Sequence, residues 1–271
     1  MPTVELGEAT LFYELAGSGP PVLSISGSGG DMRNPPGPFA WPGADGFSLL
    51  AFDHRDLGRS VSRSQEQPTM GDFARDALAL VDHVGWEHFS VFGLSFGGMV
   101  AQELALAAGD RVECLVLAAT SAGGHCGASY PLHELYELTP EQRGERLVTL
   151  LDTRAASDAA LAQAIAGYLT VDRSFATGEA APAGLLRQLE ARRRHDTCER
   201  LGALRVPTLV AAGSFDGIAP VENSSALAQR IPGARVRVFD GGHGFLLQDP
   251  RAWPEIAKFL RAGHESAGAS A

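Results

Sequence analysis

The sequence predicts an α/β protein with a doubly wound, mostly parallel sheet, and two observations lead to this fold class. Short apolar runs, among them 21–26, 48–53 and 114–118, alternate along the chain with segments of helical periodicity. Runs of this length between turn signals indicate buried strands. Buried strands that alternate with helices are typical of a parallel sheet with helices on both faces.

Composition and charge limit the possible partners. The 271 residues, of which 45% are hydrophobic, suffice for one large α/β domain or two small ones with a sizeable core. The 32 acidic and 22 basic residues give a formal net charge of −10, which disfavours nucleic acids and anionic membranes, because both require a basic surface. No apolar run approaches the roughly 20 residues of a membrane span, and residues 1–5 show no signal-peptide pattern.

The cysteines Cys114, Cys126 and Cys198 are odd in number and lack metal-ligand spacing. We therefore expect a reducing, cytoplasmic setting, with Cys114 as a small core residue inside its apolar run. His125 precedes Cys126 on a Gly-rich loop, but two adjacent residues make neither a metal site nor a Cys–His pair by themselves. No metal or cofactor motif is visible, so neither group is predicted.

The first elements are three strands. Residues 4–14 predict two short strands around Gly7, because apolar positions alternate there. The buried strand 21–26 follows a Gly-Pro turn and leads into the Gly-rich loop 27–31. Its glycines let the backbone approach a ligand closely, but the spacing and the Lys of a phosphate-binding loop are absent.

The next strand, 48–53, precedes a helix with clear end signals. A Thr-x-x-Asp cap at Thr69 predicts the start of this helix, and Gly85 predicts its end. The apolar run 89–92 is then followed by the helical pattern 99–105, so another strand–helix unit is expected there.

From about residue 121 to residue 205 the alternation stops, and helical patterns appear without a strand-like run. The run Arg192-Arg193-Arg194 lies in this segment and is typical of a solvated helix face, with an anion-binding patch as the alternative. The helical patterns cover residues 140–153, 158–168 and 183–195.

The sheet is expected to resume after this insertion. Residues 206–212 and 234–239 predict two strands, and 253–260 predicts a closing amphipathic helix. Residues 263–271 are mostly small and predict a disordered tail.

Gly93-Leu94-Ser95-Phe96-Gly97 is a Gly-x-Ser-x-Gly motif at a strand-to-helix junction. Such a turn is tight, so Gly93 and Gly97 leave room for the backbone, and the Ser95 hydroxyl projects at a helix N-terminus. The alternative is an ordinary turn, but the position between strand and helix and the partners downstream favour a nucleophile.

A serine hydroxyl needs a base to take its proton, and His243 on the Gly-rich loop 241–245 offers one. Asp216, on the loop after the preceding strand, offers the acid that orients this base. Separately, Asp216 could merely start a turn and His243 could make a structural hydrogen bond. Together with Ser95 they predict a Ser-His-Asp triad. His54 is a rival base, although its charged, turn-like surroundings favour bracing a loop.

The motif, the order Ser95, Asp216, His243 and the segment 53–60 resemble the α/β-hydrolase superfamily over nearly the whole chain. Segment 53–60, Asp-His-Arg-Asp-Leu-Gly-Arg-Ser, is closest to the variant in the methylesterase-like branch that includes aclacinomycin methylesterase. The resemblance implies an eight-stranded sheet with a helical cap. The expected divisions are a core of residues 1–124 and 205–262, a cap of residues 125–204, and a tail of residues 263–271.

The resemblance also implies an oxyanion hole made of backbone N–H groups. Phe96 supplies one donor, and Ser28 takes the position of the second, although Ser26 replaces the family's histidine and leaves Gly27 and Gly29 as alternatives. Substrate contacts are expected from Gly27, Trp41 and Tyr130. Further apolar candidates in the cap are Tyr136, Leu138, Tyr168 and Phe175.

A serine nucleophile disfavours dehalogenase and epoxide hydrolase chemistry, which in this fold uses aspartate. The expected reaction is hydrolysis of a small carboxylic ester or lactone through an acyl-enzyme. Carbon–carbon bond hydrolysis, perhydrolysis and ligand reception without turnover stay open as alternatives. The substrate is expected to be neutral and largely apolar, because the protein is acidic and the loop after residue 26 has no Lys or Arg. Arg33 is the nearby exception.

Overall fold

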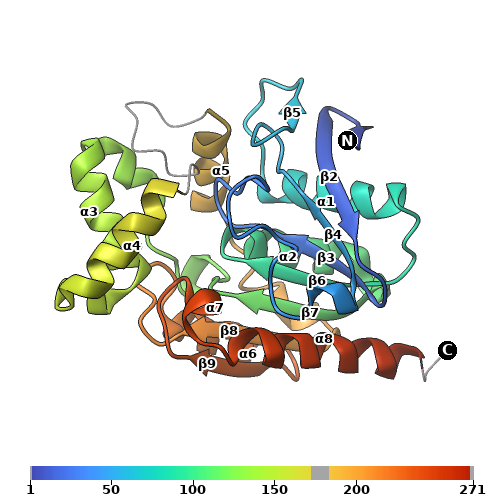
Figure 1. The fold of residues 1–271 in the computed structure, drawn as a ribbon. Coiled ribbons are helices and arrows are strands. Elements are labelled where there is room, and N and C mark those ends of the chain that lie inside the picture. The colour runs from blue at the N-terminus through green and yellow to red at the C-terminus, as the bar shows by residue number, and fades with distance from the viewer. Residues whose placement is uncertain (1, 172–182, 269–271) are drawn as a thin grey trace.

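The computed structural model describes residues 2–171 and 183–268, and a central sheet organises it (Figure 1). Eight strands form a continuous sheet in the order β1-β2-β4-β3-β6-β7-β8-β9, and the two-residue strand β5 pairs with β2. Neighbours from β4 to β9 run parallel, whereas the pairs of β2 with β1, β4 and β5 are antiparallel. The predicted fold class is confirmed, with β5 as an addition to the eight strands expected.

The elements alternate in the core as the periodicity predicts. The strands are β1 Thr3–Leu6, β2 Ala9–Ala16, β3 Pro21–Ile25, β4 Ser48–Phe52, β5 Val61–Ser62, β6 Phe89–Leu94, β7 Val112–Ala118, β8 Thr208–Gly213 and β9 Arg235–Phe239. The helices are α1 Met70–His83, α2 Phe96–Ala108, α3 Pro140–Leu151, α4 Ala159–Val171, α5 Ala183–Arg193, α6 Val221–Arg230, α7 Phe245–Gln248 and α8 Ala252–Gly268.

Two apolar clusters cover the faces of the sheet. On one face α1 and α2 pack their buried side chains, such as Phe73 and Leu104, against the strands. Helix α8 packs on the other face through Ile256 and Leu260 and runs along the sheet (Figure 1). Helix α1 starts at a capping box in which the side chain of Thr69 accepts a hydrogen bond from the N–H of Asp72, as the sequence predicts.

The segment between β7 and β8 supplies α3, α4 and α5, which lie beside the carboxyl ends of the strands (Figure 1). A third apolar cluster holds them together, and it includes two residues of the core, Leu57 and Ile218. The insertion is therefore packed onto the core by shared apolar contacts.

Helix α8 continues to Gly268, where the sequence predicts a disordered tail from residue 263. That prediction is wrong for residues 263–268, and residues 269–271 lie outside the described part. Gly263 allows close packing, because a Cβ there would come within 2.6 Å of the Cys114 sulfur. One residue further, His264 Nδ1 lies 2.8 Å from Glu113 Oε2, and these two contacts hold the helix end to β7.

Cys126 and Cys198 form a disulfide, with their Cα atoms 5.6 Å apart, where unpaired thiols were expected. They lie 72 residues apart in the chain, at the two ends of the insertion, and these ends meet only in the folded protein. Cys114 is a free, buried thiol, and burial raises its pKa to about 11. Within the described residues, no helix has the length and apolar character needed to cross a membrane.

Candidate active site

Ser95 lies in the turn between β6 and α2, with a φ of 54° and a ψ of −115°. Residues other than glycine rarely adopt a positive φ, so the backbone of Ser95 is strained and must be held by its surroundings. The N–H of Ser95 donates to Ala118 O at 2.8 Å, and the hydroxyl of Thr120 donates to Ser95 O at 2.7 Å. A Cβ on Gly97 would collide with the carbonyl oxygen of Ile25, so the turn requires glycine there.

The structure brings Ser95, His243 and Asp216 together in a hydrogen-bonded chain. His243 Nε2 lies 3.0 Å from Ser95 Oγ, and His243 Nδ1 lies 2.8 Å from Asp216 Oδ2. The other oxygen, Asp216 Oδ1, accepts hydrogen bonds of 2.8 Å from the N–H groups of Ile218 and Ala219. In the neutral imidazole the proton on Nδ1 then faces the carboxylate, and Nε2 faces the serine hydroxyl as an acceptor.

The end of helix α3 braces both loops that carry His243 and Asp216. Leu151 O accepts a hydrogen bond of 2.7 Å from the N–H of His243, and Leu150 O accepts one of 3.0 Å from the N–H of Gly217. The insertion therefore helps to align the site through backbone carbonyl groups. Any residue supplies such a carbonyl, so these contacts cannot be predicted from the residue types.

Asp152 and Gln248 form a further brace, which no motif in the sequence predicts. Gln248 Nε2 donates to Asp152 Oδ2 at 3.0 Å, and Gln248 Oε1 accepts from the N–H of Gly242 at 2.7 Å. Asp152 is fully buried and also pairs with Arg154. Its position just after a helix end resembles an ordinary turn, so only the fold identifies it as support for the His243 loop.

The loop after β3 lies against the nucleophile. A Cβ on Gly27 would be 3.5 Å from Ser95 Cβ, so Gly27 sits beside the serine. The N–H of Gly29 donates to Gln188 Oε1 at 2.8 Å, and that of Gly30 donates to Gly27 O at 3.1 Å. Among the described residues the N–H of Ser28 has no acceptor, and Phe96, as the first residue of α2, has none within its helix. Gly29 is thus occupied, whereas the N–H groups of Gly27, Ser28 and Phe96 have no acceptor in the described chain and are free to donate.

His54 contacts both Ser26, just after the end of β3, and Phe96 at the start of α2. Its Nε2 lies 3.2 Å from Ser26 O, and its ring packs edge-on against Phe96 with centroids 5.3 Å apart. The imidazole is buried, and burial lowers its pKa to about 4. A neutral ring that donates to Ser26 O braces the loop, and the residue that contacts Ser95 Oγ is His243.

The remaining predicted site residues lie in different parts of the structure, and Tyr130 is the one beside the triad loops. Trp41 stacks on Trp253 with centroids 4.6 Å apart, in the cluster on the α8 face that Leu94, the residue before the nucleophile, also joins. Tyr130 donates its N–H to Ile218 O at 2.7 Å, next to the Asp216 loop. Arg33 is exposed and pairs with Asp31. Phe175 lies outside the described residues.

The arginine run divides in the structure. Arg193 and Arg194 are solvated and pair with Glu190, as expected for an exposed helix face. Arg192 is 6% exposed, which contradicts the expected solvated position. It follows Gln188 by one turn of α5, and Gln188, which holds Gly29, is fully buried. The inward face of α5 therefore carries Gln188 and Arg192.

One group of possible metal ligands occurs among the described residues, and it consists of His125, Cys126 and Cys198. Both sulfurs belong to the disulfide and are not available as thiolates in this state. His125 Nε2 instead lies 3.0 Å from Glu199 Oε1.

A family model described as serine aminopeptidase, S33, matches residues 39–250. The chain belongs to this family of α/β-hydrolases. The hydrolase assignment predicted from the motif is therefore confirmed.

This α/β-hydrolase has similar proteins along most of its length. It is 30% identical over 265 residues to "Putative carbamate hydrolase RutD" of Azorhizobium caulinodans, covering 94% of this chain and 96% of the relative. It is 28% identical to "Poly(3-hydroxyalkanoate) depolymerase" of Ectopseudomonas oleovorans, covering 82% and 77%. The malate-bound structure of a thermophilic esterase from Thermogutta terrifontis matches with a TM-score of 0.75 and 25% identity, covering 97% and 100%.

Proposed function

We propose that this α/β-hydrolase cleaves a carboxylic ester or lactone of a small, largely apolar molecule through a covalent acyl-enzyme. The observation that carries the proposal is the chain of hydrogen bonds from Ser95 Oγ through His243 to Asp216, at the N-terminus of α2. In this geometry His243 Nε2 accepts the serine proton as the oxygen attacks the substrate carbonyl. Asp216 holds the imidazole in the required tautomer and stabilises the imidazolium that forms.

The tetrahedral oxyanion would be bound by the N–H groups of Phe96 and Ser28. The support is that Phe96 begins α2, that Ser28 has no other acceptor in the described chain, and that Gly27 lies beside Ser95. Each such donor is worth about 3 to 4 kcal/mol in the transition state. His243 then returns its proton to the leaving alcohol, and a water activated by the same imidazole releases the acid.

A carbamate is the second candidate substrate, because the relative with 30% identity is named as a carbamate hydrolase. A carbamate carbonyl undergoes the same attack and uses the same oxyanion site, so the two reactions differ in the leaving group rather than in the residues. The name of the esterase structure favours the ester.

The test combines labelling with turnover. A fluorophosphonate should label Ser95, as mapped by peptide mass spectrometry, and the label should be absent in Ser95→Ala. Turnover should then be measured on 4-nitrophenyl esters of graded acyl length, a neutral lactone and a 4-nitrophenyl carbamate. Ser95→Ala is expected to lower kcat by at least about 1,000-fold. Retention of more than a few per cent of the activity would exclude Ser95 as the nucleophile.

A further inference from the structure

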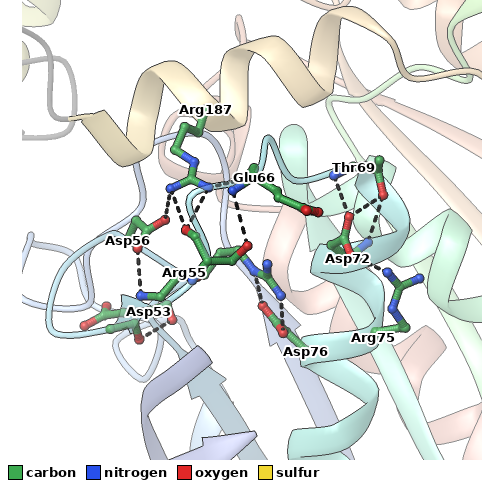
Figure 2. A network of polar contacts seen from close by, with 12 residues as sticks. Asp53, Arg55, Asp56, Glu66, Thr69, Asp72, Arg75, Asp76 and Arg187 are labelled. Atoms are coloured by element: carbon green, nitrogen blue, oxygen red, sulfur yellow. Dashed lines mark hydrogen bonds and ion pairs between the residues drawn. The ribbon is translucent and has the colours of Figure 1, made fainter. Parts of the chain in front are cut away.

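Helix α5 is fixed on the core from two directions. Arg187 Nη1 lies 3.2 Å from Asp56 Oδ2 in the loop after β4 (Figure 2). Arg187 also donates to the carbonyl of Ser64, just after β5, so it ties the helix to both segments. A Cβ on Gly184 would collide with Asp56 O, so the helix backbone rests on this loop. Gln188 holds Gly29 on the neighbouring side. The side chains on the inward face of α5 therefore have a defined place relative to the site.

This inward face spans the two loops that flank Ser95. Gln188 reaches the loop after β3, in which Gly27 lies beside the serine. One turn later, Arg192 Nη1 donates to Tyr130 O at 2.7 Å, and Tyr130 in turn donates to Ile218 in the loop that carries Asp216. Gln188 therefore holds the loop beside Ser95, and Arg192 lies at the segment that pairs with the Asp216 loop, close enough for the charge of Asp216 to act on it.

Arg192 is a buried cation, and one edge of its guanidinium is unpaired in the described chain. Its Nε and Nη2 atoms are buried and have no hydrogen-bond partner in the described chain. Burial lowers its pKa to about 10, and the charge of Asp216 acts in the opposite direction, so the guanidinium stays protonated at neutral pH. Asp216 does not pair with Arg192, because its two carboxylate oxygens are engaged by His243 and by the N–H groups of Ile218 and Ala219.

The same edge of other arginines in this protein holds carboxylates. Arg55 uses Nε and Nη2 to bind both oxygens of Asp76 at 2.7 Å, and Arg193 binds Glu190 in the same way at 2.7 and 2.8 Å. A planar fork of two parallel N–H groups matches a carboxylate in shape and charge. Gln188 adds another buried donor one turn away, because its Nε2 also has no partner in the described residues.

We propose that Arg192 and Gln188 form a carboxylate-binding subsite over Ser95, so that the preferred substrate is a small ester or lactone that carries a free carboxylate. The inference rests on the proposed serine hydrolase function and replaces the neutral substrate that the sequence predicts. Leaving Nε and Nη2 of a buried cation unpaired is costly, and a bound carboxylate would offset that cost. The subsite would orient the substrate so that its scissile carbonyl meets Ser95 Oγ.

The test compares two 4-nitrophenyl esters that differ only in the end of the acyl chain. One is the pentanoate, which ends in a methyl group, and the other is the monoester of glutaric acid, which ends in a carboxylate. Wild-type protein should prefer the glutarate monoester by kcat/KM. Arg192→Met should lower that preference about 10- to 100-fold, as expected for loss of a charge-assisted hydrogen-bond pair. Arg193→Met, which removes the exposed neighbour, is the matched control and should keep the preference.

A binding measurement separates this inference from the proposed function. Calorimetry with glutarate should show binding to Ser95→Ala, and binding at least about tenfold weaker to the Ser95→Ala/Arg192→Met double variant. If wild type hydrolysed no ester and this difference persisted, the proposed function would fail while the subsite stood. Arg192→Lys keeps the charge without the fork, and it should lose part of the preference; it serves if the Met variant does not fold. Equal glutarate binding with and without Arg192, or tighter binding of inorganic phosphate than of glutarate, would overturn the inference.

Discussion

Replacing His54 with Gln should make the protein less sensitive to mild acid. The His54 ring is buried, and burial lowers its pKa to about 4 in the folded protein, whereas an unfolded chain has a histidine pKa near 6.5. A depressed pKa means that the unfolded state takes up the proton first. The contribution of the neutral His54 to the unfolding free energy is therefore fully present above about pH 6.5 and is lost as the pH falls toward 4.

The size of the effect follows from the two pKa values. Linkage gives a loss of about 2 kcal/mol at pH 5 relative to pH 8, and a limit of about 3 kcal/mol once the pH is below both values. His195 is also buried, and burial lowers its pKa to about 4, so it contributes a similar loss. Wild type should thus lose about 4 kcal/mol through the two histidines, and His54→Gln about half of that.

The assay is urea unfolding at pH 8 and pH 5 for wild type, His54→Gln and the control His83→Gln. His83 is an exposed histidine at the end of α1, so its replacement controls for the loss of any imidazole. All other titrating groups are shared by the proteins, so their contributions cancel in the comparison. An unchanged difference in unfolding free energy between the two pH values in His54→Gln would refute the reasoning.

Three further predictions concern the acid of the triad, the glycine of the nucleophile turn and the disulfide of the insertion. Asp216→Asn should lower kcat about 1,000- to 10,000-fold with little change in the urea midpoint, because the amide preserves the fold but no longer holds His243 in the required tautomer. A structure with another carboxylate on His243 Nδ1 would contradict this. Gly97→Ala should destabilise the protein by about 1 to 3 kcal/mol, because the new Cβ would collide with Ile25 O. Gly144→Ala, whose Cβ would meet no described atom within 4 Å, should instead stabilise α3 by up to about 1 kcal/mol. Cys198→Ser should cost about 4 kcal/mol on a chain-entropy estimate, since the disulfide closes a loop of 72 residues, and reductant should destabilise wild type but not the variant.

Much of the fold was predictable because it depends on local patterns. Apolar runs that end in turn residues mark β3, β4 and β6 to β9, and the cap at Thr69 marks the start of α1. The Gly-x-Ser-x-Gly motif locates Ser95 because the turn itself imposes its sequence. Asp216 and His243 were also accessible, since parallel strands end at one edge of the sheet and bring the loops after β8 and β9 to the same place.

What the tertiary structure alone decided concerns contacts between segments that no local pattern links. Arg192 lies beside Arg193 in the chain, and only the docking of α5 buries one and exposes the other. The Cys126–Cys198 disulfide and the brace from Asp152 to Gln248 likewise join segments 72 and 96 residues apart. The physical reason is that strand and helix periods depend on near neighbours. Burial of a charge or pairing of two sulfurs depends on which surfaces meet after the chain has folded.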